Sequence, residues 1–342
     1  MHIDIFNNDA FSLRSMTAAV EKIPFVPSYL GTLGIFGPGE SVATDTVSIE
    51  RRDSILAPIL TSQRGTEPPS RSTQKAKLRS FNIPRVAAKD QVFAREIQGV
   101  RAFGTEGELV TAAQIIAQKQ AKMKQEWELT MELHRLGAAQ GILLDTDGST
   151  LYDFFAEFGI SQPAEIDFLL GAAAPVEGVL RSLVSNSVVR PVARALGAGW
   201  NPGVRIQALC GDTFYDKFVN HNDVRVSYKN WEAAAELRSS TAFAAFNFAG
   251  IDWLNYKGTD DNSTVAIGLT KVKFVVTGVP GLFRRINGPG EDFETVNTLG
   301  RPIYSQLVRD TQRNQWVQPE IYSYPLHMCS RPEVLLRGTT SN

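Results

Sequence analysis

Cysteine and histidine are scarce in this chain. Its 342 residues include two cysteines, Cys210 and Cys329, and four histidines, and none of them falls in a CxxC pair, an HExxH motif or another close Cys/His cluster. The sequence therefore predicts neither a disulfide framework nor a structural zinc site, and it fits a reducing compartment. We expect no metal and no cofactor.

An excess of charge of one sign is also missing. The chain has 35 Lys and Arg against 36 Asp and Glu, a net charge of −1. This balance argues against a surface that binds nucleic acid over its whole extent. No apolar run approaches the roughly 18 residues of a membrane span, and the first residues lack the cationic start of a signal peptide. We expect a soluble protein that is not exported by that route.

Catalytic motifs are absent too. The sequence has no GxSxG, no GxxxxGK[ST] and no GxGxxG after a strand. The acidic run 145–148 lacks the remaining ligands of a calcium loop, so it predicts a hairpin turn. Cys210, Asp212 and His221 could meet in the folded chain, but no known spacing of catalytic residues supports such a site. We therefore expect no catalytic residue.

Basic residues concentrate in one region. Residues 47–101 contain eleven Lys or Arg and five Asp or Glu, so the other 287 residues carry a net charge of −7. Within this region 47–60 and 77–83 have strand character and 64–70 is polar, which predicts a long two-stranded ribbon. Such a ribbon is marginal by itself in water. We expect it to reach a neighbouring molecule, and we expect 1–46 to be an arm that also needs a surface.

The clearest periodic element is a helix over 106–136. Its apolar stripe recurs every three or four residues and includes Ile116, Met123, Trp127 and Met131, which we expect to form the buried face, and His134, which we expect to be a packed histidine. The polar face is predicted from the pairs Lys122/Glu126, Lys124/Glu128 and Glu132/Arg135. Glycines 137 and 141 should end the helix. A second helix is predicted over 176–196, with a kink or a new turn at Pro191.

The remainder has a mixed α/β pattern. Strands are predicted over 204–210, 244–256, 271–277, 316–330 and 333–337, and Asp212 is predicted to be the N-cap of a short helix. No internal repeat is found. The fold class expected from these elements is α+β.

Several phrases of the C-terminal part are similar to those of a known family. They are CGDTFYDKF (210–218), FNFAGIDW (246–253), VPGLF (279–283), GPGED (288–292), ETVNTLGRPIY (294–304) and SYPLHMCSRPEV (323–334). In this order and spacing they resemble the major capsid (head) proteins of tailed bacteriophages, in particular the lambda-type E family with the Hong Kong 97-type fold. The N-terminal part agrees with that fold by element order.

The resemblance implies a domain division. Residues 1–46 would be an N-terminal arm and 47–86 an extended loop. A peripheral domain with the spine helix would comprise 87–198 and 300–329, and an axial α/β domain 199–299 and 330–338. Candidate inter-subunit contacts are the loop cations Arg51, Arg52, Arg64, Arg71, Lys75, Lys77 and Arg79.

The resemblance also implies a function. The chain would be a structural protein and no enzyme, self-assembling into hexamers and pentamers of an icosahedral shell around a double-stranded DNA genome. It implies a virion location after assembly in the host cytoplasm, a separate scaffolding protein and a portal. It leaves room for a decoration protein and for non-specific contact with packaged DNA, and it implies no membrane partner. The alternatives from the residues alone are a cytoplasmic homo-oligomeric enzyme and a ribbon-swapped binding protein.

Overall fold

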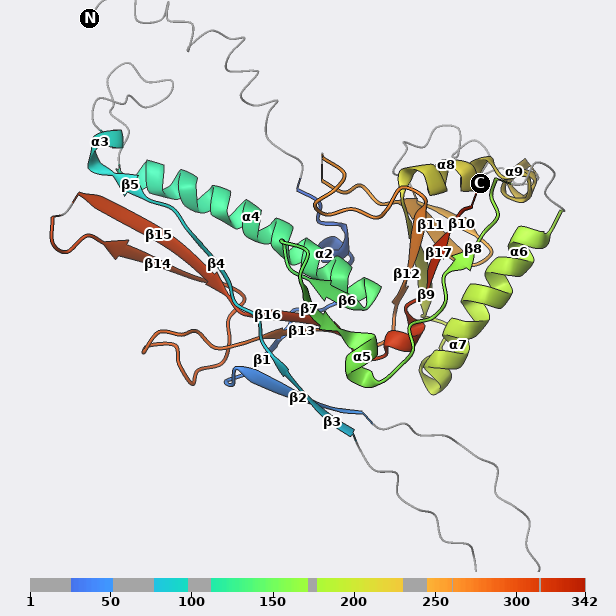
Figure 1. The fold of residues 1–342 in the computed structure, drawn as a ribbon, viewed down its shortest axis with the longest axis horizontal. Helices are drawn as coiled ribbons and strands as arrows, with labels where there is room; N and C mark the ends of the chain where they lie inside the picture. Colours follow the sequence, from blue (N-terminus) through green and yellow to red (C-terminus); the bar gives the residue numbers. More distant parts are fainter. Residues whose placement is uncertain are drawn as a thin grey trace, which may run out of the picture.

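The computed structural model is elongated. Figure 1 shows a long helix and a strand ribbon toward one end, and a sheet with helices beside it at the other. A hairpin of β2 (Thr46–Arg51) and β3 (Lys77–Asn82) leaves the middle of the molecule. The structure describes residues 26–51, 77–97, 112–171, 177–229, 245–259, 261–313 and 315–341. None of the helices within these ranges is long and apolar enough to cross a membrane.

The largest sheet has six strands in the order β10-β11-β9-β12-β17-β8. Its central strand β9 runs parallel to β11 and antiparallel to β12, so the sheet is mixed. The strands are β8 (Ile166–Asp167), β9 (Arg205–Cys210), β10 (Phe246–Phe248), β11 (Ile251–Asn255), β12 (Lys271–Thr277) and β17 (Arg337–Thr339). Because β17 completes this sheet beside β8, the C-terminal residues pack against segments that lie far away from them in the sequence.

Two smaller sheets carry the other end of the molecule. One has the order β14-β15-β4, with β5 also paired to β15, and the other has the order β1-β13-β16. Their strands are β1 (Glu40–Ser41), β4 (Val86–Lys89), β5 (Val92–Phe93), β13 (Phe283–Asn287), β14 (Tyr304–Arg309), β15 (Trp316–Ser323) and β16 (Pro325–Cys329). Only Tyr324 separates β15 from β16, so one continuous segment joins the two sheets.

Aromatic side chains fill the core of the six-stranded sheet. The Trp253 indole on β11 is fully buried and stacks on Phe218, with ring centroids 3.8 Å apart. Phe218 lies on α8 (Asp212–Asn220), which is followed by α9 (Asn222–Lys229). The strand predicted over 204–210 is confirmed. The N-cap position of α8 is held by Gly211, so Asp212 is the first helical residue and not the N-cap, and its carboxylate accepts a hydrogen bond from Asn255 Nδ2 at 2.8 Å.

The long helix is α4 (Ala112–Gln140), 29 residues, and it packs against β15 and β16. The predicted first residues, 106–111, lie outside the described part of the chain. The helix runs four residues beyond its predicted end at 136, through Gly137. A Cβ at Gly137 would lie 2.9 Å from the Ile142 carbonyl oxygen, so this glycine permits close packing and does not end the helix. Gly141, with φ of 84°, follows the last turn.

The second predicted helix is continuous from 179 to 196 but changes type. It comprises α6 (Val179–Val184), a π-helical segment (Ser185–Val189) and α7 (Arg190–Leu196). The π-helical segment ends directly before Arg190 and Pro191. Because proline has no N–H to donate into the preceding turn, a wider turn at this point relieves the conflict without ending the helix. The predicted irregularity at Pro191 is therefore confirmed.

Three predicted strands are corrected. The segment 244–256 is a hairpin, β10 and β11, since Ala249 and Gly250 have positive φ and form its turn. The segment 316–330 is divided into β15 and β16. The segment 333–337 is mostly not a strand: Pro332 begins a short 3-10 helix (Pro332–Val334), which buries Val334 in the core.

The remaining short elements join these parts. The predicted hairpin at 147–148 is confirmed, with β6 (Ile142–Leu144) paired to β7 (Thr150–Asp153). The others are α2 (Tyr29–Leu33), α3 (Ala94–Ile97), α5 (Phe154–Phe158) and the 3-10 turn (Gly197–Gly199).

Candidate assembly surfaces

The base of the β2–β3 hairpin is held firmly to the body. Phe81 is fully buried, and its ring packs against those of Tyr152, Phe154 and Phe158 at centroid distances of 5.4, 6.1 and 5.9 Å. The Tyr152 hydroxyl accepts a hydrogen bond from the Asn82 N–H at 2.9 Å and donates one to the Asn82 carbonyl at 2.8 Å. The two strands therefore leave the molecule from a fixed point.

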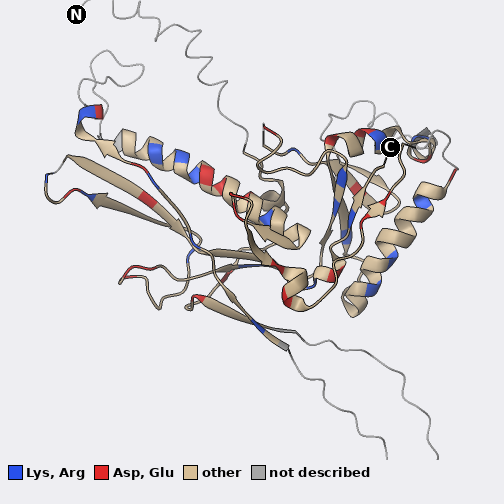
Figure 2. Cartoon of the chain, in the orientation of Figure 1, with Lys and Arg blue, Asp and Glu red and all other residues tan. Residues whose placement is uncertain are grey.

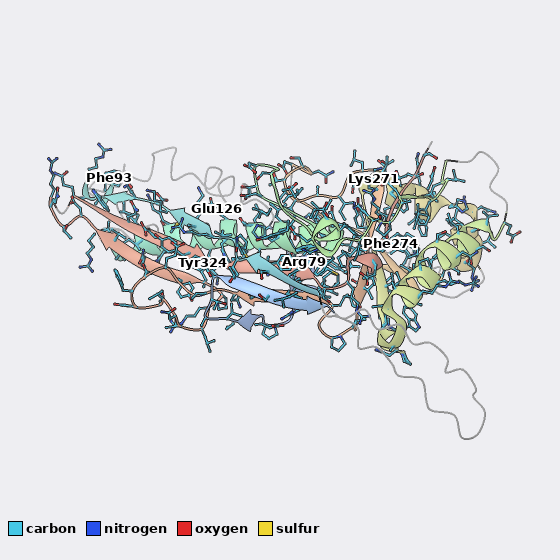
Figure 3. All side chains as sticks on the ribbon, turned by 60° about the horizontal axis from the view of Figure 1, so that its bottom comes forward. Arg79, Phe93, Glu126, Lys271, Phe274 and Tyr324 are labelled. Carbon is cyan, nitrogen blue, oxygen red and sulfur yellow. The ribbon has the colours of Figure 1, made fainter. Side chains whose placement is uncertain are left out.

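The seven candidate contact cations are placed unequally. Arg52, Arg64, Arg71 and Lys75 lie outside the described residues. Arg51 and Lys77 are paired positions at the outer end of the hairpin. Arg79, which is labelled in Figure 3, lies opposite Ile49 on this hairpin and is exposed to solvent. Their contact with another subunit stays a prediction.

The four predicted core residues of α4 are of two kinds. Met123 and Met131 are 4% and 0% exposed, whereas Ile116 and Trp127 are only half-buried. The Trp127 indole Nε1 is buried but has no hydrogen-bond partner among the described residues. Figure 2 shows cations and anions mixed along α4, and Lys122 and Glu126 form one of the predicted pairs at 4.0 Å.

Glu132 is the largest departure from the predicted polar face of α4. Its side chain is fully buried. Oε1 accepts hydrogen bonds from the Leu30 N–H at 2.8 Å and the Tyr256 hydroxyl at 3.2 Å, and Oε2 accepts from the Gly31 N–H at 3.1 Å and Arg135 Nη1 at 3.2 Å. One carboxylate therefore joins α2, α4 and the end of β11.

This carboxylate also replaces a missing cap. The side chain of Ser28, the N-cap residue of α2, makes no capping hydrogen bond, and the N–H groups whose hydrogen bonds Glu132 accepts are those that a cap would satisfy. Burial, reinforced by the charge of Glu132, raises the pKa of Tyr256, so this hydroxyl stays a hydrogen-bond donor. No sequence pattern indicates this role, because Glu132 and Arg135 have the ordinary spacing of an exposed helical pair.

Two histidines are buried beside this junction. His134 on α4 and His327 on β16 have ring centroids 6.2 Å apart, and Phe36 meets His327 edge-on at 5.1 Å. Burial lowers the pKa of His134 to about 4. Burial, together with Arg135, His134 and Arg285, lowers the pKa of His327 well below its usual range. Both rings are therefore neutral at pH 7, and the packed position predicted for His134 is confirmed.

The comparison with known proteins agrees with this architecture. Residues 12–340 match the family model described as "Phage major capsid protein E". The chain belongs to this family. The major capsid protein of Salmonella phage Felix O1 is 24% identical over 95% of this chain and 95% of its own length. The major capsid protein of Pseudomonas phage KPP10 is 25% identical over 96% of each chain.

A solved structure has the same fold. The capsid of Myoviridae phage XM1 matches with a TM-score of 0.54 and 12% identity over 94% of this chain and 93% of that one. The predicted α+β class and Hong Kong 97-type fold are confirmed.

The residues considered for catalysis have structural roles in this capsid-family chain. Cys210 is buried in β9, and burial raises the pKa of its thiol. Asp212 accepts the hydrogen bond from Asn255, and the His221 Nδ1 accepts one from the Asp223 N–H at 3.2 Å. Within the described residues no group of three or more His, Cys, Asp or Glu is placed to hold a metal ion.

The burial of α4 gives a direct prediction for stability. Met131→Ala is expected to lower the free energy of unfolding by about 2–5 kcal/mol, because it removes a fully buried side chain and leaves a cavity. Trp127→Ala should cost less in the isolated subunit, since the indole is half-buried there. Urea unfolding of the two variants checks this order, and an equal or larger loss for Trp127→Ala would contradict it.

Proposed function

We propose that this chain is the shell-forming subunit of a phage head. Copies assemble into hexamers and pentamers, which close into an icosahedral shell around a double-stranded DNA genome. The observation that carries the proposal is the family match over residues 12–340. The virion is then its final location, after assembly in the host cytoplasm, and it acts as a structural protein and not as an enzyme.

The structure supports this proposal through its hairpin. A two-stranded hairpin that packs on no further sheet gains little stability alone. In this chain the buried side chain of Phe81 attaches β2 and β3 to the body, and the two strands extend from it together. Contact with a neighbour would give it a partner surface. In a closed shell many modest contacts of this kind act together, so that the whole is stable although each contact is weak.

We further propose the domain division given by the resemblance. The arm is 1–46, the extended loop 47–86, the peripheral domain 87–198 with 300–329, and the axial domain 199–299 with 330–338. The loop cations, including Arg51 and Arg79, contact a neighbouring subunit. The other partners of the chain are a separate scaffolding protein, a portal, a decoration protein and, through non-specific contact, packaged DNA.

Salt dependence tests the proposed role of the loop. The rate of assembly is expected to fall as ionic strength rises, because the positive region 47–101 and the negative remainder attract one another and exposed charges are screened beyond about 8 Å at physiological salt. Light scattering and sedimentation velocity measure this rate. Arg51→Gln with Arg79→Gln should weaken the dependence, whereas the control Lys122→Gln with Lys124→Gln on α4 should not.

Two outcomes would contradict the proposal. A 37.6 kDa monomer that persists under all salt conditions and with scaffolding protein present would refute the shell. A fixed small oligomer of the same size under every condition would favour the ribbon-swapped binding protein.

A further inference from the structure

The helix over 179–196 has a regular four-residue pattern of burial. Every fourth side chain lies in the core, with an exposed fraction of 2% or less: Leu180, Val184, Val188, Val192 and Leu196. In a regular α-helix a four-residue spacing drifts around the axis by about 40° at each step, because one turn has about 3.6 residues. The wider turn of the π-helical segment takes up part of this drift. One row of side chains therefore stays buried along the whole helix, and the row opposite to it stays exposed.

The exposed row consists of polar and cationic side chains. Two positions along from the buried row lie Ser182, Asn186, Arg190 and Arg194, all exposed, and Arg181 is exposed beside Ser182. We call these five residues the arginine row. Arg190 Nη1 donates a hydrogen bond to Asn186 Oδ1 at 2.6 Å, which orients this guanidinium along the row. Figure 2 shows blue and no red along α6 and α7, so the helix presents charge of one sign.

No carboxylate neutralises the arginine row within the described part of the chain. Its three guanidiniums form no ion pair there. Glu177, just before the helix, is exposed and pairs with none of them. Asp223 of α9, which packs against α6, is buried and accepts hydrogen bonds from the Gly178 and Leu180 N–H groups at 3.0 and 3.1 Å, so its charge stabilises the start of α6. The row is therefore a local positive surface that attracts anions.

The spacing of the guanidiniums suits a nucleic-acid backbone. At about 1.5 Å per residue, Arg190 and Arg194 are separated by about 6 Å along the helix axis, and Arg181 lies about 14 Å before Arg190. The row therefore spans about 20 Å, the length of about six base pairs of a duplex at about 3.4 Å each. Arginine, serine and asparagine are also side chains that contact phosphate oxygens in protein–DNA complexes. One duplex can therefore place phosphates against all three guanidiniums.

A protein partner is less well matched by this surface. The centre of a protein–protein interface is typically apolar and holds aromatic anchors, but the arginine row contains no apolar side chain. It has no counterpart of Phe293, which is fully exposed on the loop 288–303 between β13 and β14. A polyanion that is recognised through its charge needs no such anchor. The observations therefore favour DNA over an acidic protein surface.

We propose that the arginine row binds the phosphate backbone of double-stranded DNA. Arg181, Arg190 and Arg194 each contact a phosphate, Ser182 and Asn186 donate further hydrogen bonds to the backbone, and no base is read. This inference rests on the proposed shell function and assigns the contact with packaged DNA to one surface. Because the binding depends on charge, it is independent of DNA sequence and weakens as salt rises.

The salt dependence of DNA binding by the full-length chain tests the arginine row. Fluorescence anisotropy measures the binding constant of two labelled duplexes of different sequence, from low to physiological salt. Each phosphate contact contributes about 0.9 to the slope of the logarithm of the binding constant against the logarithm of the salt concentration. The variant with Arg181→Gln, Arg190→Gln and Arg194→Gln should therefore have a slope shallower by about 2.7 on both duplexes.

Two control variants make this result specific to the row. The variant with Arg181→Lys, Arg190→Lys and Arg194→Lys keeps the charge and should keep the wild-type slope. The variant with Lys122→Gln, Lys124→Gln and Arg309→Gln removes three exposed cations of α4 and β14 and should leave the slope unchanged, although its net charge equals that of the first variant. All substituted residues are exposed, so the fold should be retained in each variant.

Three outcomes would overturn the proposed DNA surface while the shell stands. They are no binding of DNA by the wild type at low salt, a wild-type slope in the glutamine variant of the row, and an equal change of slope in the control on α4 and β14. A wild-type slope combined with lost assembly would place an acidic surface of a neighbouring copy on the row instead. Sedimentation velocity reads assembly separately, and failure of the wild type itself to assemble would refute the proposed function.

Discussion

Glu132→Ala is expected to lower the free energy of unfolding by about 3–5 kcal/mol, the cost of removing one partner from a buried ion pair. The substitution leaves the Arg135 guanidinium, which is only 16% exposed, without its carboxylate. It also removes the acceptor for the Leu30 and Gly31 N–H groups, so α2 loses its attachment to α4. Urea unfolding followed by circular dichroism measures the loss.

Two control variants make this result specific. Glu126→Ala removes an exposed carboxylate of the same helix and should cost about 0–1 kcal/mol. Glu132→Gln keeps the length of the side chain but loses the charge, so it should fall between the two. Equal stability of Glu132→Ala and Glu126→Ala would show that the buried carboxylate does not hold the junction together.

Acid is expected to destabilise the subunit through its two buried histidines. The pKa of His134 in the folded protein is about 4, against 6.5 for an ordinary histidine, so the unfolded chain binds the proton first. The free energy of unfolding is therefore intact above pH 6.5 and falls by up to about 1.4 kcal/mol per pH unit as the pH drops toward 4, about 3 kcal/mol in all. His327, whose pKa is also lowered, adds a loss of the same sign.

The surroundings of His327 explain why it resists protonation. Arg135 and His134 face it from α4 and Arg285 from β13, and Phe36 covers it from the N-terminal side. Both of its ring nitrogens are buried without hydrogen-bond partners among the described residues. A proton on this ring would thus be buried among cations.

Paired pH measurements check this expectation. Unfolding free energies of the wild type, His134→Phe and His327→Phe are compared at pH 7.5 and 4.5. Each variant should lose less stability over this interval than the wild type, because it no longer binds that proton on unfolding. Exposed carboxylates contribute equally to all three proteins. An unchanged pH dependence in both variants would show that other groups govern the acid response.

The periodic elements could be predicted from sequence because their determinants are local. The apolar repeat of α4 and the alternation in β12 follow from neighbouring residues, and the resemblance supplied the fold. Long-range contacts could not be predicted in this way. Glu132 is buried by α2, about a hundred positions away in the chain, yet its own spacing is that of an exposed pair. Trp127 shows the converse, since its place in the apolar stripe does not bury it fully.

The setting of the proposed contact residues likewise depends on long-range packing that sequence patterns do not express. Charge counting located the basic loop, and the structure places Arg79 on its exposed hairpin. The residues around 288–294 carry a family resemblance but no pattern that indicates an exposed loop. The exposure of Phe293 depends on how β13 and β14 hold the loop, which the sequence pattern does not express.

Negative-stain electron microscopy of the purified full-length chain, with scaffolding protein and at low salt, tests the central claim most directly. The proposed function predicts closed shells, or tubes and rings built from the same repeating subunit contact. A field of separate 37.6 kDa particles at every salt and protein concentration would contradict it.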